Sequence, residues 1–199
     1  MAIELLVNFA ISVINALGLP GIFVLMALES TAAPVPSEAV LPFAGFLVAQ
    51  GKMDFLLVVL AATFGSIVGS LASYYIGYFG GKPAVLKIGK YFLLNEKHLE
   101  HTEKFFAKHG GKTIFIARFV PVVRHLISIP AGIGKMQKRK FIFLTALGAG
   151  MWNTFLIWVG IKLQANWNEI LKYSQILDYI ILAVLGILAI KFLLKLRKA

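Results

Sequence analysis

The stretch Thr31–Gln50 reads TAAPVPSEAVLPFAGFLVAQ, an apolar segment that we do not expect to form one straight membrane-spanning helix. Three prolines interrupt it, Pro34, Pro36 and Pro42. A proline inside a helix removes a backbone hydrogen bond and collides with the preceding turn. In a membrane, such a break is tolerated only where protein covers the freed backbone groups. We therefore expect a re-entrant helical hairpin over about residues 30–50.

A second apolar stretch, Thr113–Gly134, is interrupted in the same way. It reads TIFIARFVPVVRHLISIPAGIG and contains Pro121 and Pro130. We expect a second re-entrant hairpin over about residues 113–134. The two stretches form a weak internal repeat. Each contains prolines and is followed by Gly-Lys-Met and then by a glycine-bearing apolar run. Entry from opposite sides of the membrane would make them an inverted repeat, an architecture common among transporters.

The rest of the chain is dominated by long apolar runs. Hydrophobic residues make up 59% of the 199 residues, and the mean hydropathy is +0.82. A segment of ~20 apolar residues crosses the ~30 Å hydrocarbon layer of a membrane. We predict an all-α integral membrane protein, one polytopic domain over residues 1–199 with about four transmembrane helices and two opposed re-entrant hairpins. The predicted spans are Glu4–Leu28, Asp54–Phe79, Phe141–Leu163 and Tyr173–Leu194.

Lysine and arginine are distributed unequally between the loops. In this topology the N-terminus, Gly80–Lys112, Lys135–Lys140 and the C-terminal tail share one side, which holds 15 Lys/Arg against three on the other. Such an excess marks the cytoplasmic side, so we expect a multi-pass plasma-membrane protein with both termini in the cytoplasm. Contact with anionic membrane lipids accounts for the formal net charge of +11. Nucleic acid is not an expected partner, because no basic stripe alternates with stacking aromatics.

The long cytoplasmic loop contains a predicted amphipathic helix over about residues 95–109. Asn95 is a suitable N-cap, and Gly110–Gly111 can end the helix. His98 and His101 lie one turn apart, but no tight cluster of three ligands forms, so we expect no metal. The chain has no cysteine, which excludes disulfides and thiolate metal sites. No cofactor is expected, and the N-terminal apolar run should remain as a helix rather than be cleaved.

Small residues line one face of the second predicted span. Gly65, Gly69 and Gly77 recur at multiples of four residues, so another helix backbone can approach this face closely. This pattern indicates helix packing and carries no chemistry. Trp152 and Asn153 can line a cavity, although a hydrogen bond between helices explains Asn153 equally well.

Four ionisable residues lie at or within the predicted hairpins: Glu29, Glu38, Arg118 and Arg124. A charge at the centre of a membrane costs ~2.5–3.5 kcal/mol even on the mildest scale, so such residues are candidates for function. A purely structural explanation is an ion pair that holds the hairpins together. Two acids and two bases exceed what one such pair needs. A spare carboxylate can carry a proton, and paired guanidinium groups can hold a phosphate bidentately.

These residues resemble the motifs of the DedA family, which belongs to the SNARE-associated or VTT-domain superfamily. The resemblance covers about Gly21–Ile161. It implies two opposed re-entrant hairpins and a role in returning undecaprenyl phosphate, the lipid carrier of cell-wall synthesis, across the plasma membrane with the proton gradient. The essential acids of the family fall on Glu29 and Glu38, and its essential arginines on Arg118 and Arg124. The matching motifs are Glu29-x4-Pro34-x-Pro36-Ser-Glu38, Gly69-x4-Tyr74-x2-Gly77, and Phe115-x2-Arg118-Phe-x-Pro121-x2-Arg124 followed by Ala131-Gly132 and Met136.

The leading hypothesis is a proton-coupled flippase for a lipid phosphate carrier, without enzymatic activity. Arg118 and Arg124 would bind the phosphate, and Glu29 and Glu38 would compete for the same arginines and couple transport to protons. Three alternatives stay open: an uncoupled phospholipid scramblase, a non-enzymatic scaffold for envelope maintenance, and an intramembrane lipid-phosphate hydrolase. The hydrolase lacks a supporting motif, since no Walker A loop, GxSxG or HExxH occurs. Assembly into a homo-oligomer is also left open.

Overall fold

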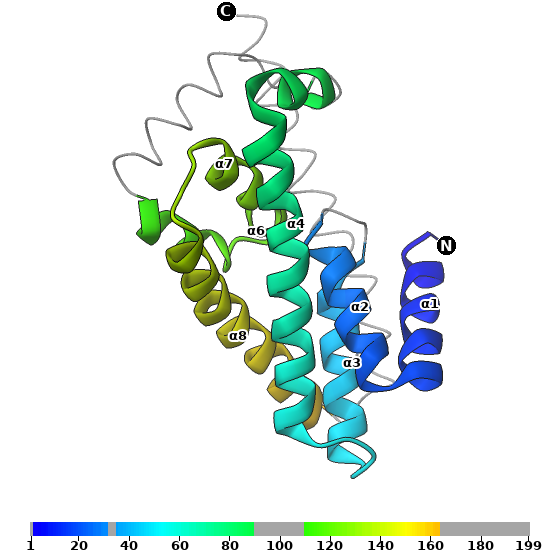
Figure 1. The fold of residues 1–199 in the computed structure, drawn as a ribbon. Coiled ribbons are helices and arrows are strands. Elements are labelled where there is room, and N and C mark those ends of the chain that lie inside the picture. Colours follow the sequence, from blue (N-terminus) through cyan, green and yellow to red (C-terminus); the bar gives the residue numbers. More distant parts are fainter. Residues whose placement is uncertain (1, 32–34, 90–109, 164–199) are drawn as a thin grey trace, which may run out of the picture. The chain divides into compact units, whose positions relative to one another are not determined.

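A computed structural model of the protein describes residues 2–31, 35–89 and 110–163, and all regular structure within these ranges is helical. This confirms the all-α prediction for the described part of the chain. Three predicted features lie outside these ranges: Pro34, the amphipathic helix at 95–109 and the fourth span, Tyr173–Leu194. The helices are α1 (Ala2–Leu17), α2 (Leu19–Glu29), α3 (Ser37–Ala49), α4 (Phe55–Gly89), α6 (Pro121–Leu126), α7 (Ser128–Ile133) and α8 (Lys138–Lys162), with a further helical stretch at 110–117 (Figure 1).

The chain divides into two compact units, Met1–Ile161 and Lys162–Ala199. The described residues lie almost entirely in the first unit. The single domain expected over residues 1–199 therefore stays a prediction.

The first predicted span, Glu4–Leu28, is two helices rather than one. Gly18 has a φ of 61°, a backbone conformation that glycine adopts readily, and a proline follows in the first turn of α2. The chain reverses at Gly18, so that α1 and α2 pack against each other (Figure 1). The first hairpin consequently comprises α2 and α3, and its first limb begins earlier than the expected residue 30.

The second hairpin is built from short helices. Pro121 is the first residue of α6, where a missing N–H costs no helical hydrogen bond. Pro130, by contrast, lies inside α7 rather than at a break. A proline is tolerated there because the first N–H groups of a helix have no partner within the helix. The break between α6 and α7 falls at Ile127, which ends one helix and precedes the next.

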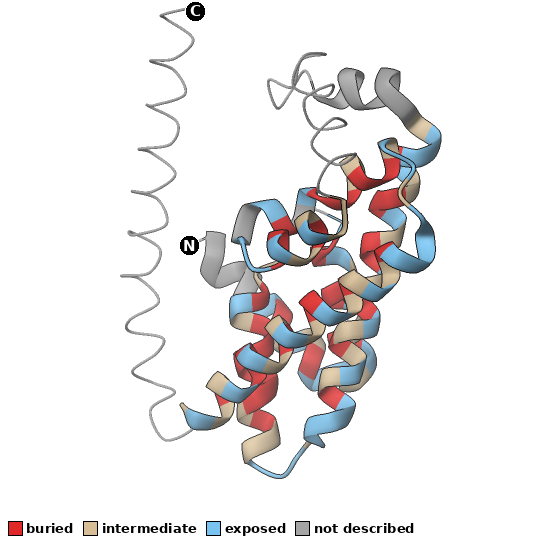
Figure 2. Ribbon diagram, turned by 90° about the vertical axis from the view of Figure 1, so that its left-hand side faces the viewer, coloured by how far each residue is buried: buried red, intermediate tan, exposed pale blue. Residues whose placement is uncertain are grey.

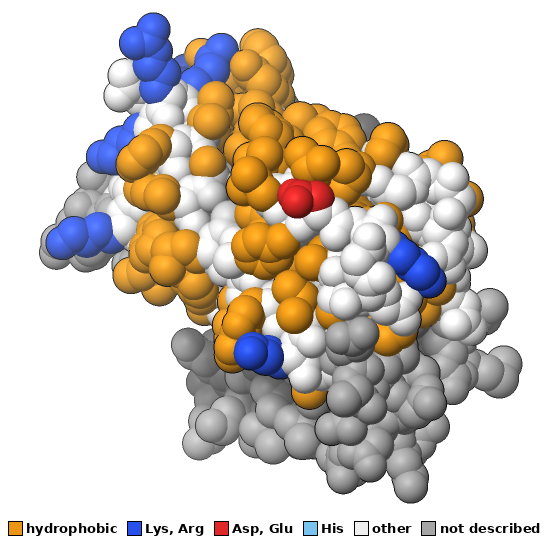
Figure 3. All heavy atoms as spheres, turned by 90° about the horizontal axis from the view of Figure 1, so that it is seen from below, with side chains coloured by type: hydrophobic (Ala, Val, Ile, Leu, Met, Phe, Trp, Pro, Cys, Tyr) orange, Lys and Arg blue, Asp and Glu red, His pale blue; other side chains and the backbone are white. Residues whose placement is uncertain are grey.

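Two helices are long and apolar enough to cross a membrane among the residues described. They are the Phe55–Gly80 part of α4, with a mean hydropathy of 2.2, and α8, with a mean hydropathy of 1.6. Their outward faces carry large apolar side chains, and the buried residues lie on the faces that the helices turn toward one another (Figure 2). The outward faces of these helices suit contact with lipid. The view from below shows apolar and other side chains mixed, with an acidic side chain near the middle and Lys and Arg toward the margins (Figure 3).

The return limb of the first hairpin packs backbone to backbone against α8. A Cβ placed on Gly45 in α3 would lie 2.1 Å from the carbonyl oxygen of Ile157, and one on Gly160 in α8 would lie 2.1 Å from that of Pro42. Both distances are too short for any Cβ. Each helix therefore needs a glycine at the point where it meets the other.

The return limb of the second hairpin meets α4 in the same reciprocal way. A Cβ on Gly77 in α4 would lie 2.2 Å from the carbonyl oxygen of Ile129, and one on Gly132 in α7 would lie 2.0 Å from that of Tyr74. Each hairpin thus packs its return limb on the long helix that follows the other hairpin. The predicted inverted-repeat arrangement of the two hairpins stays a prediction.

The same face of α4 also holds the first limb of the first hairpin. A Cβ on Gly65 would approach the carbonyl oxygen of Phe23 to 2.3 Å, and one on Gly69 would approach that of Ala27 to 2.1 Å. Helix α4 therefore packs against α2 with its first half and against α7 with its second half. Both hairpins therefore pack against the same helix, α4 (Figure 1).

Candidate functional site

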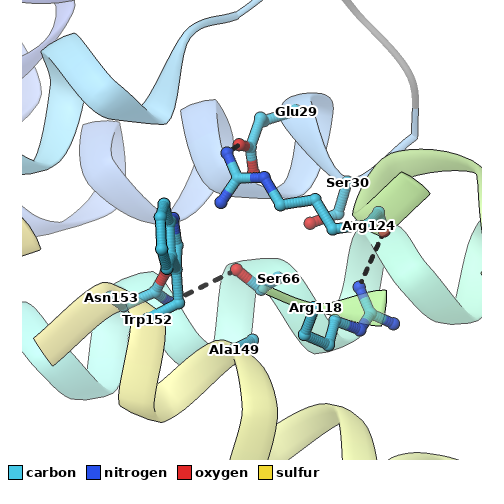
Figure 4. A pocket seen from close by; sticks show the side chains of 8 residues that line it. All are labelled: Glu29, Ser30, Ser66, Arg118, Arg124, Ala149, Trp152 and Asn153. Carbon is cyan, nitrogen blue, oxygen red and sulfur yellow. Dashed lines mark hydrogen bonds and ion pairs between the residues drawn. The ribbon is translucent and has the colours of Figure 1, made fainter. Parts of the chain in front are cut away.

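The ends of short helices carry the four predicted ionisable residues. Glu29 is the last residue of α2, and Glu38 lies in the first turn of α3. Arg124 lies in α6, and Arg118 lies in the turn that precedes it. Residues from both hairpins meet at one cavity, and Figure 4 shows Glu29, Arg118 and Arg124 around it.

The guanidinium group of Arg124 joins the two hairpins. Its Nη2 donates to Oε1 of Glu29 and to the hydroxyl of Ser37, and it donates to Oε1 of Glu38 at 3.0 Å. Ser37 in turn approaches Oε2 of Glu38 at 3.4 Å. Arg124 is only 6% exposed, so the two carboxylates stabilise a cation that burial would otherwise destabilise.

Arg118 makes a different set of contacts. Its Nη1 donates to the carbonyl oxygen of Arg124 at 3.2 Å, and its Nη2 donates to the hydroxyls of Ser128 at 3.2 Å and Thr145 at 3.0 Å. These partners lie in α6, α7 and α8, and Arg118 is 4% exposed. Arg118 therefore ties together the elements that hold Arg124 in place.

The two glutamates differ in their access to the surroundings. The side chain of Glu29 is 4% exposed, and that of Glu38 is 41% exposed. Beside Glu29, the carbonyl of Ser30 accepts a hydrogen bond from the hydroxyl of Ser73 at 3.1 Å, which attaches the end of α2 to α4. The Glu29 carboxylate is thus enclosed by protein, and the Glu38 carboxylate is partly exposed at the protein surface.

The cavity between these groups is small. Its volume is about 10 Å³, roughly the space that one water molecule occupies. Helix α4 contributes Ser66, to which the Asn153 amide donates across the cavity at 3.4 Å. The residues that line the cavity are Glu29, Ser30, Ser66, Arg118, Arg124, Ala149, Trp152 and Asn153 (Figure 4).

Sequence reasoning did not assign several residues of this site. Ser37 adjoins Glu38 in the Pro-Ser-Glu motif, so its place in the sequence was a usable signal. Ser128 and Thr145 gave no signal, because an isolated hydroxyl in an apolar run is ordinary. Trp152 was noted only as a cavity-lining residue, yet its ring lies 5.4 Å from the Arg124 guanidinium carbon.

Metal ligands do not gather in the part of the chain that the structure describes. No group of three His, Cys, Asp or Glu side chains lies close enough to hold a metal ion there. The histidines considered above, His98 and His101, lie outside the described residues.

The fold and site define a helical membrane protein with a charged cluster between two helical hairpins, and comparison with known proteins identifies its family. Residues 35–162 match the VTT domain. The chain belongs to this family, and the predicted resemblance is confirmed.

Three relatives illustrate the range of names within the family. The chain is 38% identical to undecaprenyl phosphate transporter A of Bacillus subtilis over 83% of its own length and 84% of the relative's. It is 37% identical to an alkaline phosphatase-like protein of Lactococcus lactis over 94% and 91% of the two chains. It is 34% identical to the protein DedA of Escherichia coli over 63% and 58%. No solved structure matches the chain.

Proposed function

We propose that the protein moves a lipid phosphate, of the undecaprenyl phosphate type, across the plasma membrane without chemical turnover. The observation that carries this proposal is the buried Arg124, which two carboxylates and a hydroxyl bind from the opposite hairpin. A phosphate group offers oxygen acceptors of the same kind as those that Arg124 already binds. The transporter name of the Bacillus subtilis relative supports this choice of substrate.

Arg118 and Arg124 are the proposed phosphate-binding residues. A cavity of about 10 Å³ cannot hold a phosphate group. Phosphate must therefore displace Glu29 and Glu38 from Arg124, and the two hairpins must separate as it enters. Because the carboxylates bind the same guanidinium as the substrate does, binding of substrate and release of the carboxylates are coupled.

Glu29 and Glu38 are the proposed proton-coupling residues. Protonation removes the negative charge that holds a glutamate on Arg124 and frees the guanidinium for phosphate. The exposed Glu38 is suited to exchange protons with the exterior, and the enclosed Glu29 is suited to keep a proton during the movement. The lipid tail stays in the membrane in this mechanism, and only the headgroup passes between the hairpins.

The decisive experiment measures movement of the headgroup of an isoprenyl phosphate in vesicles that contain the purified protein. Arg124→Lys should reduce the rate about tenfold or more, because an ammonium group cannot reproduce the two-pronged contact of a guanidinium. Arg139→Lys, an exposed position at the start of α8, is the matched control and should transport normally. Full transport by Arg124→Lys at normal protein level would refute the phosphate-binding role.

The same vesicle experiment distinguishes the proposed transport from two other functions, hydrolysis and scrambling. The phosphatase-like name of the Lactococcus lactis relative favours testing a hydrolase, so release of inorganic phosphate should be measured, and we expect none. A scramblase would move the lipid equally well with or without a pH gradient. We expect the gradient to accelerate transport in one direction.

The proposed topology places both termini and the start of α8 in the cytoplasm. In Figure 1, α1 and α8 run downward and α4 runs upward, which supports this alternation. The chain has no cysteine, so single cysteines can be labelled cleanly. We expect an impermeant thiol reagent to label Lys52→Cys in intact cells, and Arg139→Cys only after the membrane is opened. The opposite pattern would overturn the topology.

A further inference from the structure

The indole N–H of Trp152 is a buried donor that the proposed mechanism does not yet use. The side chain extends from α8 toward the guanidinium of Arg124, and it lines the cavity (Figure 4). Its Nε1 is buried and has no hydrogen-bond partner among the described residues. A tryptophan N–H can only donate, and buried donors without an acceptor are rare because they are costly.

Two other unpartnered donors belong to the same cavity. The Nε atoms of Arg118 and Arg124 are also buried without a hydrogen-bond partner among the described residues. Both arginines are more than nine-tenths buried. Three N–H groups on three of the lining residues therefore lack acceptors, and an anion with several oxygen atoms would supply them.

The position of the Trp152 ring is held by aromatic neighbours. It contacts Phe119 edge to face, with ring centroids 6.4 Å apart, and Phe155 with centroids 5.9 Å apart. Both phenylalanines are partly exposed, at 36% and 51%. Trp152 thus stands between the buried arginine and the apolar surface of the protein, with its ring restrained from two sides.

We propose that Trp152 is a third headgroup-binding residue, whose indole N–H donates to a phosphate oxygen while its ring remains against Arg124. This inference rests on the proposed function, since it assumes that a phosphate enters the cavity. The indole N–H adds a hydrogen-bond donor for a phosphate oxygen. Because it adds no positive charge, it does not strengthen the electrostatic attraction of the competing carboxylates to the site. A hydroxyl at this position would also accept hydrogen bonds and would select less strictly for an anion.

The test compares two probes on the full-length protein in detergent. Farnesyl phosphate carries an isoprenyl chain with a phosphate, and farnesol carries the same chain without it. Trp152→Phe removes the N–H and keeps an aromatic ring, and it should weaken farnesyl phosphate about tenfold while leaving farnesol unchanged. Trp158→Phe is the matched control on α8, because Trp158 is 50% exposed, and it should bind both probes as the unmodified protein does.

A spectroscopic measurement keeps the inference testable if Trp152→Phe does not fold. In the variant Trp158→Phe/Trp167→Phe, Trp152 is the one remaining tryptophan. Farnesyl phosphate should shift its fluorescence emission, and farnesol should not.

Either of two results would overturn the role of Trp152. One is a Trp152→Phe variant that binds farnesyl phosphate normally or loses both probes equally, and the other is an emission that phosphate does not change. If the unmodified protein bound farnesyl phosphate no more tightly than farnesol, the proposed function would fail instead. If the tests of Trp152 failed in one of these ways but Arg124→Lys lost binding of farnesyl phosphate, the proposed function would remain supported, and only the role of Trp152 would be rejected.

Discussion

The two hairpins perform the same architectural task by different means. In the first, α2 and α3 have 11 and 13 residues, and helical hydrogen bonds satisfy most of their backbone. In the second, α6 and α7 have six residues each, so a larger share of their backbone groups lacks a partner within the helix. Arg118 donates to one backbone group of this hairpin, the carbonyl of Arg124, and also to the side-chain hydroxyl of Ser128.

This difference separates the roles of the two arginines. Arg118 holds the short helices of its own hairpin together and contacts α8 through Thr145. Arg124 reaches across to the glutamates of the other hairpin. Both arginines are proposed to bind phosphate. Arg124 must release its two carboxylate partners for this, whereas Arg118 contacts a carbonyl and two hydroxyls.

The largest expected effect comes from removing the cation that joins the hairpins. Arg124→Leu should lower the free energy of unfolding by about 3–5 kcal/mol, because it breaks a buried ion pair from one side. The check is an equilibrium unfolding titration in mixed detergent micelles. The double variant Glu29→Gln/Arg124→Leu should recover part of the loss, and an absence of recovery would show that the two residues do not stabilise each other.

The reciprocal glycine contacts test whether the hairpins are equivalent. Gly132→Ala and Gly45→Ala should each cost about 1–3 kcal/mol, because a methyl group would collide with a carbonyl of the neighbouring helix. Gly150→Ala is the control, since the nearest atom to its Cβ would be 3.7 Å away on Thr63. Unfolding of the three variants in the same titration gives the comparison. A loss at only one hairpin would show that the two interfaces differ in tightness.

The contacts of Arg118 test its stabilising role. Thr145→Val keeps the shape of the side chain and removes one acceptor, so it should cost about 1–2 kcal/mol of stability. If the main role of Arg118 is to hold the neighbouring helices in place, Thr145→Val should lower the transport rate per folded molecule less than Arg124→Lys does. The measurement pairs thermal unfolding with vesicle transport. A Thr145→Val variant of normal stability and no transport would instead place Thr145 in the transport step.

The smallest expected effect on stability is at the exposed carboxylate. Glu38→Gln should change the unfolding free energy by less than about 1 kcal/mol, because the Glu38 side chain is 41% exposed and Arg124 keeps its ion pair with Glu29. Glu29→Gln, in the enclosed position, should cost more. Both variants should lose the dependence of transport on an imposed pH gradient. If both retained that dependence at the normal rate, the carboxylates would be structural and the coupled mechanism would be wrong.

The sequence was informative where a residue has one main physical reason to be present. The ionisable residues were found because charge is costly in a membrane, and they do lie together. Pro121 was predicted only as a break in the hairpin; in the structure it begins α6, where its missing N–H is harmless. The reversal at Gly18 was missed, since one glycine among apolar residues does not reveal a φ of 61°. Pro130 was expected at a break but lies inside α7. Its sequence context could not decide between the two, because a proline is equally compatible with a helix break and with the first turn of a helix.

The site was harder to predict where it depends on contacts between distant residues. Thr145 is 27 positions from Arg118 along the chain, and nothing in its own neighbourhood indicates the hydrogen bond between them. Trp152 becomes significant only beside Arg124, when its N–H is seen to have no partner. Such roles follow from packing of the helices, which residue type and spacing do not specify.

The exchange of glycine contacts between the two halves has a consequence for biosynthesis. The return limb of the first hairpin needs Gly160 in α8 as its partner, and a ribosome reaches that glycine roughly ten seconds after it completes α3. During this interval α3 exists before the glycine on which it docks has been made. Its native packing must therefore wait for α8, and neither half of the chain should mature when expressed alone.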